Sequence, residues 1–542
     1  MSKRASPAGR KTCGVRFLVL LFVVTLFAHC ALPQEKAGSH RHFPVTDPKN
    51  FTRVVATVGN IAITAQEFLL SYEFGPAFTK RRKESRQRYL EFMVNEKLLA
   101  LDARAHGLRN SVRVTKSLGE LEGDMATEEL FKDDVLSHVT VTGAEVAEGV
   151  REERIHYSLQ WLFASGPADA AAQRAEINRG TPFDTLFARQ LLSGVKRDDR
   201  SMESTLFKLR RANPAIASVA ETLRAGSCSE PVRGTDGYYI IRIADGWRDV
   251  TLSASESQKS EEDARRALTQ EKSDSLSDRY VRQMMLEHNP VIIRRTFNRL
   301  HAWLGGIWVR PERLAGWGIA GESGRLRDSA GVRRIDRYGS DSLVSISGGR
   351  ILLSQFLSWY RARDTYFRLN TAAEQAFFIS VEDLVWRMVR DRLLVDRAIR
   401  RNLQERDPVK KQLRWWEDKI LFGEEKIVLG SSVVPGDSAC RAFYDANARE
   451  YRTDSGAAQP FEQVKDQVRK DYYMFELKKN MLHRIIALKR KYPVIVKDDV
   501  LMSLPVDIED NPKAIDVYMA KKGGTFPHPA FPVIDFEWAT WM

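Results

Sequence analysis

The sequence predicts a mainly α-helical, multi-domain protein that contains one α+β module. Apolar residues recur at helical spacing between Glu84 and Leu108, strand-like and helical runs alternate between Glu153 and Val250, and the first helical pattern returns later in the chain. A chain of 542 residues is also far longer than one hydrophobic core usually supports. We therefore expect several domains.

Residues 1–30 have the pattern of an export signal. Five basic residues precede an apolar run, residues 17–27, which is short for a membrane span and typical of a signal peptide. Cys30 follows His29, where a lipoprotein cleavage box has a small residue. Lipidation of Cys30, ordinary signal cleavage and retention as an anchor therefore all stay open. A polar linker, residues 31–50, follows.

Charge and cysteine content limit the functions to consider. The formal net charge of +13 falls to about +8 without the signal, an excess that favours anionic lipid or acidic polypeptide, and we expect no nucleic acid partner. Outside the signal only Cys228 and Cys440 remain, far apart in sequence. We expect two free thiols, and a disulfide between them stays open. We expect no metal site and no cofactor.

The first folded domain is expected to cover residues 51–152. A β-branched run, residues 54–58, turns at Gly59-Asn60 and leads into a helix capped by Thr64. Apolar residues at intervals of three and four predict a long amphipathic helix over residues 84–108. Further helices are expected over residues 111–136 and from about residue 142.

The pattern of this domain recurs about 290 residues later. The matching blocks, first and second copy in turn, are residues 59–68 and 349–356, 96–100 and 391–395, 139–143 and 433–437, and the closing segments 289–293 and 492–496. We predict an internal duplication in which residues 341–504 form a second helical unit that lacks the module of residues 153–250. Chance similarity between amphipathic helices is the alternative.

Three further segments complete the expected organisation. Residues 251–296 supply the closing helix of the first unit, and residues 297–340 form a tryptophan-containing connector packed on one of the helical units. Residues 505–542 form a C-terminal tail whose aromatic side chains allow it to dock rather than float.

Two parts of the sequence resemble known folding factors. The helix from Val94 to Leu108 resembles the central helix in the N-terminal domain of SurA, PrsA and PpiD type folding factors. The ending formed by residues 226–232 and 237–243 resembles the last turn and strand of a parvulin-type peptidyl-prolyl isomerase. The resemblance implies a four-stranded antiparallel sheet with helices in residues 153–250, and a periplasmic chaperone or isomerase acting on unfolded polypeptides.

The resemblance also implies a substrate-binding site. Family members use two facing histidines, a nearby cysteine or aspartate and an apolar proline pocket. Here Gln160 and Tyr239 stand in place of the histidines, and Ser193 aligns best with the cysteine or aspartate. Phe207 falls where the family has a glycine-rich turn before an aromatic residue, and Ile216 falls at an apolar residue of the proline pocket. We expect Gln160, Ser193 and Tyr239 to be able to hydrogen-bond one another, and we name no catalytic residue with certainty.

The leading hypothesis is an exported, periplasmic chaperone that holds unfolded or nascent secreted and outer-membrane polypeptides, with a weak or inactive parvulin-like domain. Attachment to a membrane through the N-terminus depends on the fate of Cys30. An active isomerase with an altered centre is the first alternative. A structural envelope protein with one folded partner is the second.

Overall fold

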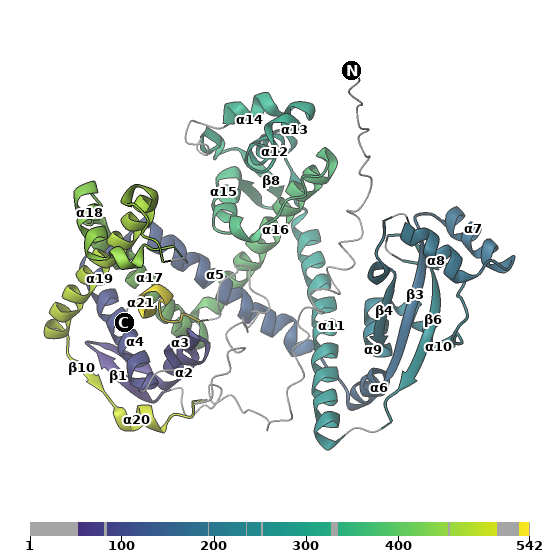
Figure 1. Ribbon diagram of the computed structural model, residues 1–542, viewed down its shortest axis with the longest axis horizontal. Coiled ribbons are helices and arrows are strands. Elements are labelled where there is room, and N and C mark those ends of the chain that lie inside the picture. The colour runs from purple at the N-terminus through teal and green to yellow at the C-terminus, as the bar shows by residue number, and fades with distance from the viewer. Residues whose placement is uncertain are drawn as a thin grey trace. The chain divides into compact units, whose positions relative to one another are not determined.

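The computed structural model describes residues 52–80, 84–192, 194–234, 236–250, 253–326, 334–453, 456–506 and 531–540 (Figure 1). The predicted signal, the linker, Cys30 and Ser193 lie outside these ranges. The described residues divide into two compact units. One contains Val139–Ser275 and is named here the inserted module; the other, the helical body, contains the described residues up to His138 and from Leu276 onward. No helix in these ranges is long and apolar enough to cross a lipid bilayer.

The helical body begins with the strand, turn and helix that the sequence predicts. Strands β1 (Val54–Val58) and β2 (Ile61–Thr64) pair antiparallel, and α2 (Ala65–Phe74) follows directly. The Thr64 hydroxyl accepts a hydrogen bond from the backbone N–H of Glu67 at 3.2 Å. This bond satisfies one of the free amides at the start of α2 and confirms the predicted cap.

Two long helices, α4 (Ser85–Ala105) and α5 (Val112–Asp134), confirm the two predicted amphipathic helices. Gly107 follows α4 with a φ of +74°, a left-handed conformation that glycine adopts at little cost. The Ser111 hydroxyl then accepts a hydrogen bond from the N–H of Val114 at 3.3 Å and caps α5. Gly107 and the Ser111 cap thus define the short connection between α4 and α5.

The same order of elements occurs a second time in the helical body. The register shift between Val54 and Ala56 in the first hairpin recurs between Ser342 and Val344 in the second. Asn402, with a φ of +57°, follows the second long helix as Gly107 follows the first. The second set of elements is β8 (Ser342–Ile346), β9 (Gly349–Leu352), α15 (Leu353–Arg361), α16 (Glu374–Arg400) and α17 (Asp407–Ser431).

The closing strands are exchanged between the two copies. Strand β10 (Val494–Val496), at the end of the second copy, pairs antiparallel with β1 of the first copy. Strand β7 (Val291–Ile292), at the end of the first copy, pairs with β8 of the second. The expectation that each segment closes its own copy is therefore wrong. Both segments read Pro-Val-Ile, so their sequences fit either hairpin equally well.

The long helices are exchanged as well, because α17 packs on α4 and α5 packs on α16. The result is two hybrid cores within the helical body, each built from both copies. The first cradle contains the sheet β10-β1-β2 with α2, α4, α17 and α19 (Phe461–Lys491). The second cradle contains the sheet β7-β8-β9 with α12 (Arg294–Trp308), α15 and α16.

A buried ion triad crosses the contact between α4 and α17. The Nζ of Lys97 lies 2.5 Å from Glu67 and 2.7 Å from Asp418, and all three side chains are buried. Burial raises the pKa of the Glu67 carboxyl even though Lys97 opposes the shift. Glu67 and Lys97 come from the first copy and Asp418 from the second. The triad therefore joins the two copies through buried ion pairs.

The predicted connector and tail both pack on the helical body. Trp303 of α12 is buried in the core of the second cradle. Ile534 and Trp538 of the C-terminal segment are buried in the core of the first cradle. The remaining helices of the body are α3 (Ala77–Lys80), α13 (Pro311–Gly316), α14 (Ala320–Leu326), α18 (Asp437–Ala446), α20 (Asp498–Ser503) and α21 (Phe536–Thr540).

The inserted module contains a four-stranded antiparallel sheet in the order β4-β3-β6-β5. Together with the helical body, this sheet confirms the predicted fold class of helical units plus one α+β module. Cys228 of the module and Cys440 of the body are both free thiols, as expected. The elements of the module are α6 (Gly143–Glu153), β3 (Ile155–Ala164), α7 (Pro167–Asn178), α8 (Phe183–Leu192), β4 (Ser201–Thr205), α9 (Leu206–Ala212), α10 (Pro214–Thr222), β5 (Val232–Arg233) and β6 (Tyr238–Arg248), and α11 (Ala254–His288) begins in the module and ends in the body.

Replacing Lys97 with methionine should destabilise the helical body by about 3 kcal/mol, because the buried Glu67 would lose its ion-pair partner and Asp418 would keep only Arg104. The midpoint of urea unfolding, followed by circular dichroism, measures the change. Lys479→Met is the matched control, since the Nζ of Lys479 lies 3.5 Å from Glu476 in an exposed pair. It should change stability by less than about 0.5 kcal/mol. Equal midpoints for the two variants would contradict a stabilising role for the triad.

Candidate functional site

The register between β3 and β6 decides which side chains of the inserted module can meet. Successive side chains of a strand point to opposite faces of the sheet. Phe163 lies opposite Tyr239 and Trp161 lies opposite Ile241, and these four side chains belong to the hydrophobic core that includes residues of α9 and α10. Gln160 directly precedes Trp161 in sequence, so it points to the other face.

The face toward α9 and α10 carries a half-buried apolar surface, named here the aromatic patch. The rings of Phe163 and Tyr239 meet edge to face, with centroids 5.5 Å apart. The guanidinium of Arg200 lies over the Phe163 ring at 5.2 Å. The patch consists of the partly buried side chains of Trp161, Phe163, Met202 and Ile216 together with the buried ring of Tyr239. Ile216 and Tyr239 are thus the two predicted site residues that the structure brings together.

The hydroxyl of Tyr239, which is the polar group of the patch, already has a hydrogen-bond partner. Its hydroxyl donates a hydrogen bond to Asp236, three residues earlier. Burial, together with Asp236, raises the pKa of Tyr239 above its ordinary value. Gly234 lets the chain pass close to the ring, because a Cβ there would lie 2.4 Å from a Tyr239 ring carbon. The phenol is therefore held as a neutral, positioned donor.

The opposite face of the sheet carries a charged cluster that sequence reasoning missed. The Gln160 side-chain oxygen accepts a hydrogen bond from Arg242, and the Arg242 guanidinium lies 2.6 Å from Asp184 of α8. The same guanidinium lies over the Phe183 ring at 4.4 Å. Cys228 packs on this face, and burial raises the pKa of its thiol. The cluster holds α8 against the sheet.

The expected hydrogen bonding between Gln160 and Tyr239 is wrong. Gln160 pairs with Arg242 across the strands, and Arg242 is three residues from Tyr239 on the same strand. An odd separation places two strand residues on opposite faces. The alternation of Tyr239, Ile241 and Ile243 toward one core could have identified this from sequence, but alignment to the family motif concealed it.

Two other predicted residues do not join the aromatic patch. Phe207 packs against Val146 of α6 and Ala264 of α11, in a separate small core of the module. Gly149 faces the same ring, since a Cβ there would lie 3.0 Å from it. Phe207 therefore joins helices of the module and does not line the patch. Ser193 lies outside the described residues.

The single histidine in the sequence of residues 153–250 lies away from the aromatic patch. The Nε2 of His156 lies 2.9 Å from Asp249, and its ring stacks on Trp247 with centroids 5.1 Å apart. On the described part of the patch, the titratable side chains are Tyr239 and the neighbouring Arg200 and Asp236. The patch thus offers apolar area and one phenol donor, without an imidazole.

A group of possible metal ligands in the helical body is better explained by an arginine. Asp102, His106 and Glu425 place ligand atoms within 4.8 Å of one another. Arg484 forms a two-pronged ion pair with Asp102 and lies 3.4 Å from the Nε2 of His106. The Arg484 guanidinium therefore supplies the positive charge that a metal ion would otherwise supply to these residues.

Comparisons with known proteins give a limited likeness. No family model and no curated protein matches the chain. Among solved structures, the chain is similar to PrsA, a peptidylprolyl isomerase from Bacillus cereus, with 18% identity, a TM-score of 0.22, and coverage of 40% of this chain and 85% of that one.

Two further solved structures are similar to part of this chain. One comes from the work on PEB4 and Cj1289, described as SurA-like chaperones of Campylobacter jejuni, with 16% identity, a TM-score of 0.18, and coverage of 43% and 97%. The other is PrsA from Bacillus subtilis, with 16% identity, a TM-score of 0.15, and coverage of 42% and 91%. These proteins are folding factors of the kind that the sequence resembles.

Restoring both family histidines should not create an isomerase. In the double variant Gln160→His/Tyr239→His the two imidazoles would lie on opposite faces of the sheet, so they could not share one substrate. The rate of cis to trans conversion of a proline-containing tetrapeptide, with a parvulin-type isomerase as positive control, should equal that of the unmodified protein. A clear gain in rate would contradict the face assignment.

Proposed function

We propose that this protein is an exported chaperone that holds unfolded secreted and outer-membrane polypeptides, and that its parvulin-like module binds chains without accelerating X-Pro isomerisation. One observation carries the proposal: the module presents an aromatic patch in which the hydroxyl of Tyr239 is held by Asp236 and none of the described side chains is a histidine. The patch thus offers a binding surface without the pair of histidines that the resembling family uses.

The chemistry of the patch favours holding over catalysis. Rotation about a peptide bond has a barrier of about 18–20 kcal/mol, and lowering it requires groups that disfavour the planar amide. The Tyr239 phenol is a neutral donor committed to a carboxylate. Trp161, Phe163 and Met202 offer apolar area instead, and the flexible Met202 adapts to different side chains.

The patch is also suited to unfolded chains as a class. It is half-buried, so it gains apolar burial when a chain covers it, and it demands no specific sequence.

Export rests on the sequence of residues 1–30, with its basic start and its short apolar run. Cys30 sets whether the mature chain is anchored as a lipoprotein or released to the periplasm. Mass measurement of the mature N-terminus distinguishes the two. An unprocessed N-terminus retained in the cytoplasm would contradict export.

The full chain should suppress aggregation of an unfolded test protein, measured by light scattering, without accelerating proline isomerisation in a tetrapeptide assay. Acceleration would instead support the isomerase alternative. Recovery of one stoichiometric partner from cells, with no effect on aggregation, would support the structural alternative. Either result would contradict the chaperone proposal.

A charge in the aromatic patch should weaken this activity. Ile216→Asp should raise the concentration needed for half-suppression about tenfold, equivalent to about 1.4 kcal/mol of binding free energy, because the carboxylate must lose its hydration when a chain covers it. Ile486→Asp is the matched control, since Ile486 is 52% exposed on α19, outside the module. Equal effects of the two substitutions would show that the aromatic patch does not bind client chains.

A further inference from the structure

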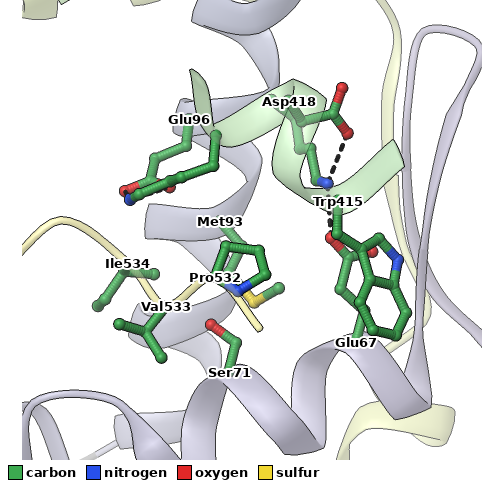
Figure 2. Close-up of a pocket in the computed structure, with 11 residues that line it drawn as sticks. Glu67, Ser71, Met93, Glu96, Trp415, Asp418, Pro532, Val533 and Ile534 are labelled. Atoms are coloured by element: carbon green, nitrogen blue, oxygen red, sulfur yellow. Dashed lines mark hydrogen bonds and ion pairs between the residues drawn. The ribbon is translucent and has the colours of Figure 1, made fainter. Parts of the chain in front are cut away.

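A pocket in the first cradle is closed by the chain's own C-terminal segment. Helices α2, α4 and α17 form its walls, and the segment forms the remaining side (Figure 2). The pocket and the surface along which the segment continues are named here the tail groove. The helices line the pocket with Glu67, Ser71, Met93, Glu96, Lys97, Trp415, Asp418 and Lys419, and the segment lines it with Pro532, Val533 and Ile534.

Aromatic contacts hold the segment along the groove. Ile534 and Trp538 are buried, whereas Phe536 is 63% exposed. The ring pairs, with their centroid distances, are Phe74 with Phe531 at 5.0 Å, Phe78 with Phe536 at 5.3 Å and Phe92 with Trp538 at 6.5 Å. The segment thus places an aromatic or aliphatic side chain against the cradle at most of its positions.

Polar contacts fix the position of the segment. The backbone N–H of Asp535 donates a hydrogen bond to Glu96 at 2.7 Å. The Nζ of Lys426 lies 3.2 Å from Asp535 and 3.0 Å from Glu537. A backbone amide held by a side chain, with a cation facing the acidic residues, is a mode of contact that a separate peptide can also make.

The pocket is not filled as a permanent core would be. A cavity of about 30 Å³ remains beside the segment, which is room for about one water molecule. Glu67 is buried, and its Oε2 has no hydrogen-bond partner among the described residues. Protein interiors are normally close-packed, with their buried polar atoms paired. The cavity and the Glu67 oxygen without a partner both lie in the pocket between the segment and the helices.

In the second copy, the space that corresponds to the tail groove is filled by a side chain of the copy's own helix. Ser71 of α2 corresponds to Trp359 of α15, and Glu96 of α4 corresponds to Asp391 of α16. The Nε1 of Trp359 donates a hydrogen bond to Asp391 at 3.0 Å, and Phe367 stacks on Trp359 at 5.2 Å. The second copy therefore supplies an indole from its own chain to this acidic residue. The first copy has a serine there, and a distant segment comes to the equivalent carboxylate.

We propose that the tail groove is a binding site for extended, aromatic-rich polypeptide segments, and that residues 531–540 occupy it as an intramolecular competitor. This inference rests on the proposed chaperone function and assigns it a second site. The favoured client segment carries the chemistry of the occupant, Phe-Pro-Val-Ile-Asp-Phe-Glu-Trp: large apolar side chains with acidic residues opposite Lys426.

The connection is long enough for the segment to leave the groove. Residues 507–530 link Val506 to Phe531. Fully extended, a link of this length spans up to about 80 Å. This length lets the segment leave the groove while it stays attached to the chain.

The experiment compares the full chain with a variant that ends at Ala530. The probes are a fluorescein-labelled peptide of residues 531–540 and reduced, carboxymethylated lactalbumin as a permanently unfolded protein. The truncated variant should bind the peptide, and it should bind the unfolded protein about tenfold more tightly than the full chain does, because no competitor has to leave. Unlabelled peptide should displace the unfolded protein from the truncated variant.

Ser71→Trp in the full chain provides a second test that does not remove the segment. The new indole copies Trp359 and should displace the segment, which limited proteolysis would detect as faster cleavage within residues 531–540. In the truncated chain the same substitution should abolish peptide binding. Ser255→Trp, at an exposed serine of α11, is the matched control and should leave both readouts unchanged.

The outcomes separate the two proposals. If the full chain suppresses aggregation, but neither truncation nor the peptide affects binding of the unfolded protein, the tail groove is only a structural socket and this inference is overturned alone. If neither chain holds unfolded protein, the proposed function fails and this inference fails with it. If the truncated chain does not fold, slower cleavage or unchanged cleavage of the segment in the full-length Ser71→Trp variant overturns the inference.

Discussion

The antiparallel pairing of β10 with β1 and of β7 with β8 is the constraint on which the helical body depends. Each three-stranded sheet is completed by a strand from the other copy. Neither copy can therefore bury its hairpin without the other. The chain behaves like a dimer whose two subunits have been joined in one sequence and have exchanged their ends, with Lys97 buried between carboxylates from both.

This joining frees the two copies to diverge, which identical subunits cannot do. One copy has the sheet β4-β3-β6-β5 and its helices between α6 and α11, whereas the other has a short loop between α18 and α19. One copy fills the space beside its acidic residue with Trp359, whereas the other has Ser71 and receives the C-terminal segment. The shared fold is preserved while the surfaces take different roles.

In the proposed function, the inserted module supplies an apolar binding surface and no catalytic centre. The apolar face of the sheet retains Trp161, Phe163 and Ile216, which need only area and shape. A catalytic centre needs particular groups on one face at matched positions, and the strand register places Gln160 and Tyr239 on opposite faces.

Sequence alone determined the local elements and much of their order. Hydrophobic periodicity predicts α4 and α5, and Thr64 predicts the start of α2, because these signals lie within a few residues of one another. Repeated blocks about 290 residues apart predict a second copy. Tertiary structure decided which strand closes which sheet and which helix packs on which, since the two Pro-Val-Ile segments are interchangeable locally. It also decided that Phe207 joins helices, that Arg242 and Asp184 hold one face of the sheet, and that residues 531–540 lie on the first cradle. Contacts between distant segments depend on register and three-dimensional fit, and a local pattern of side chains carries information on neither.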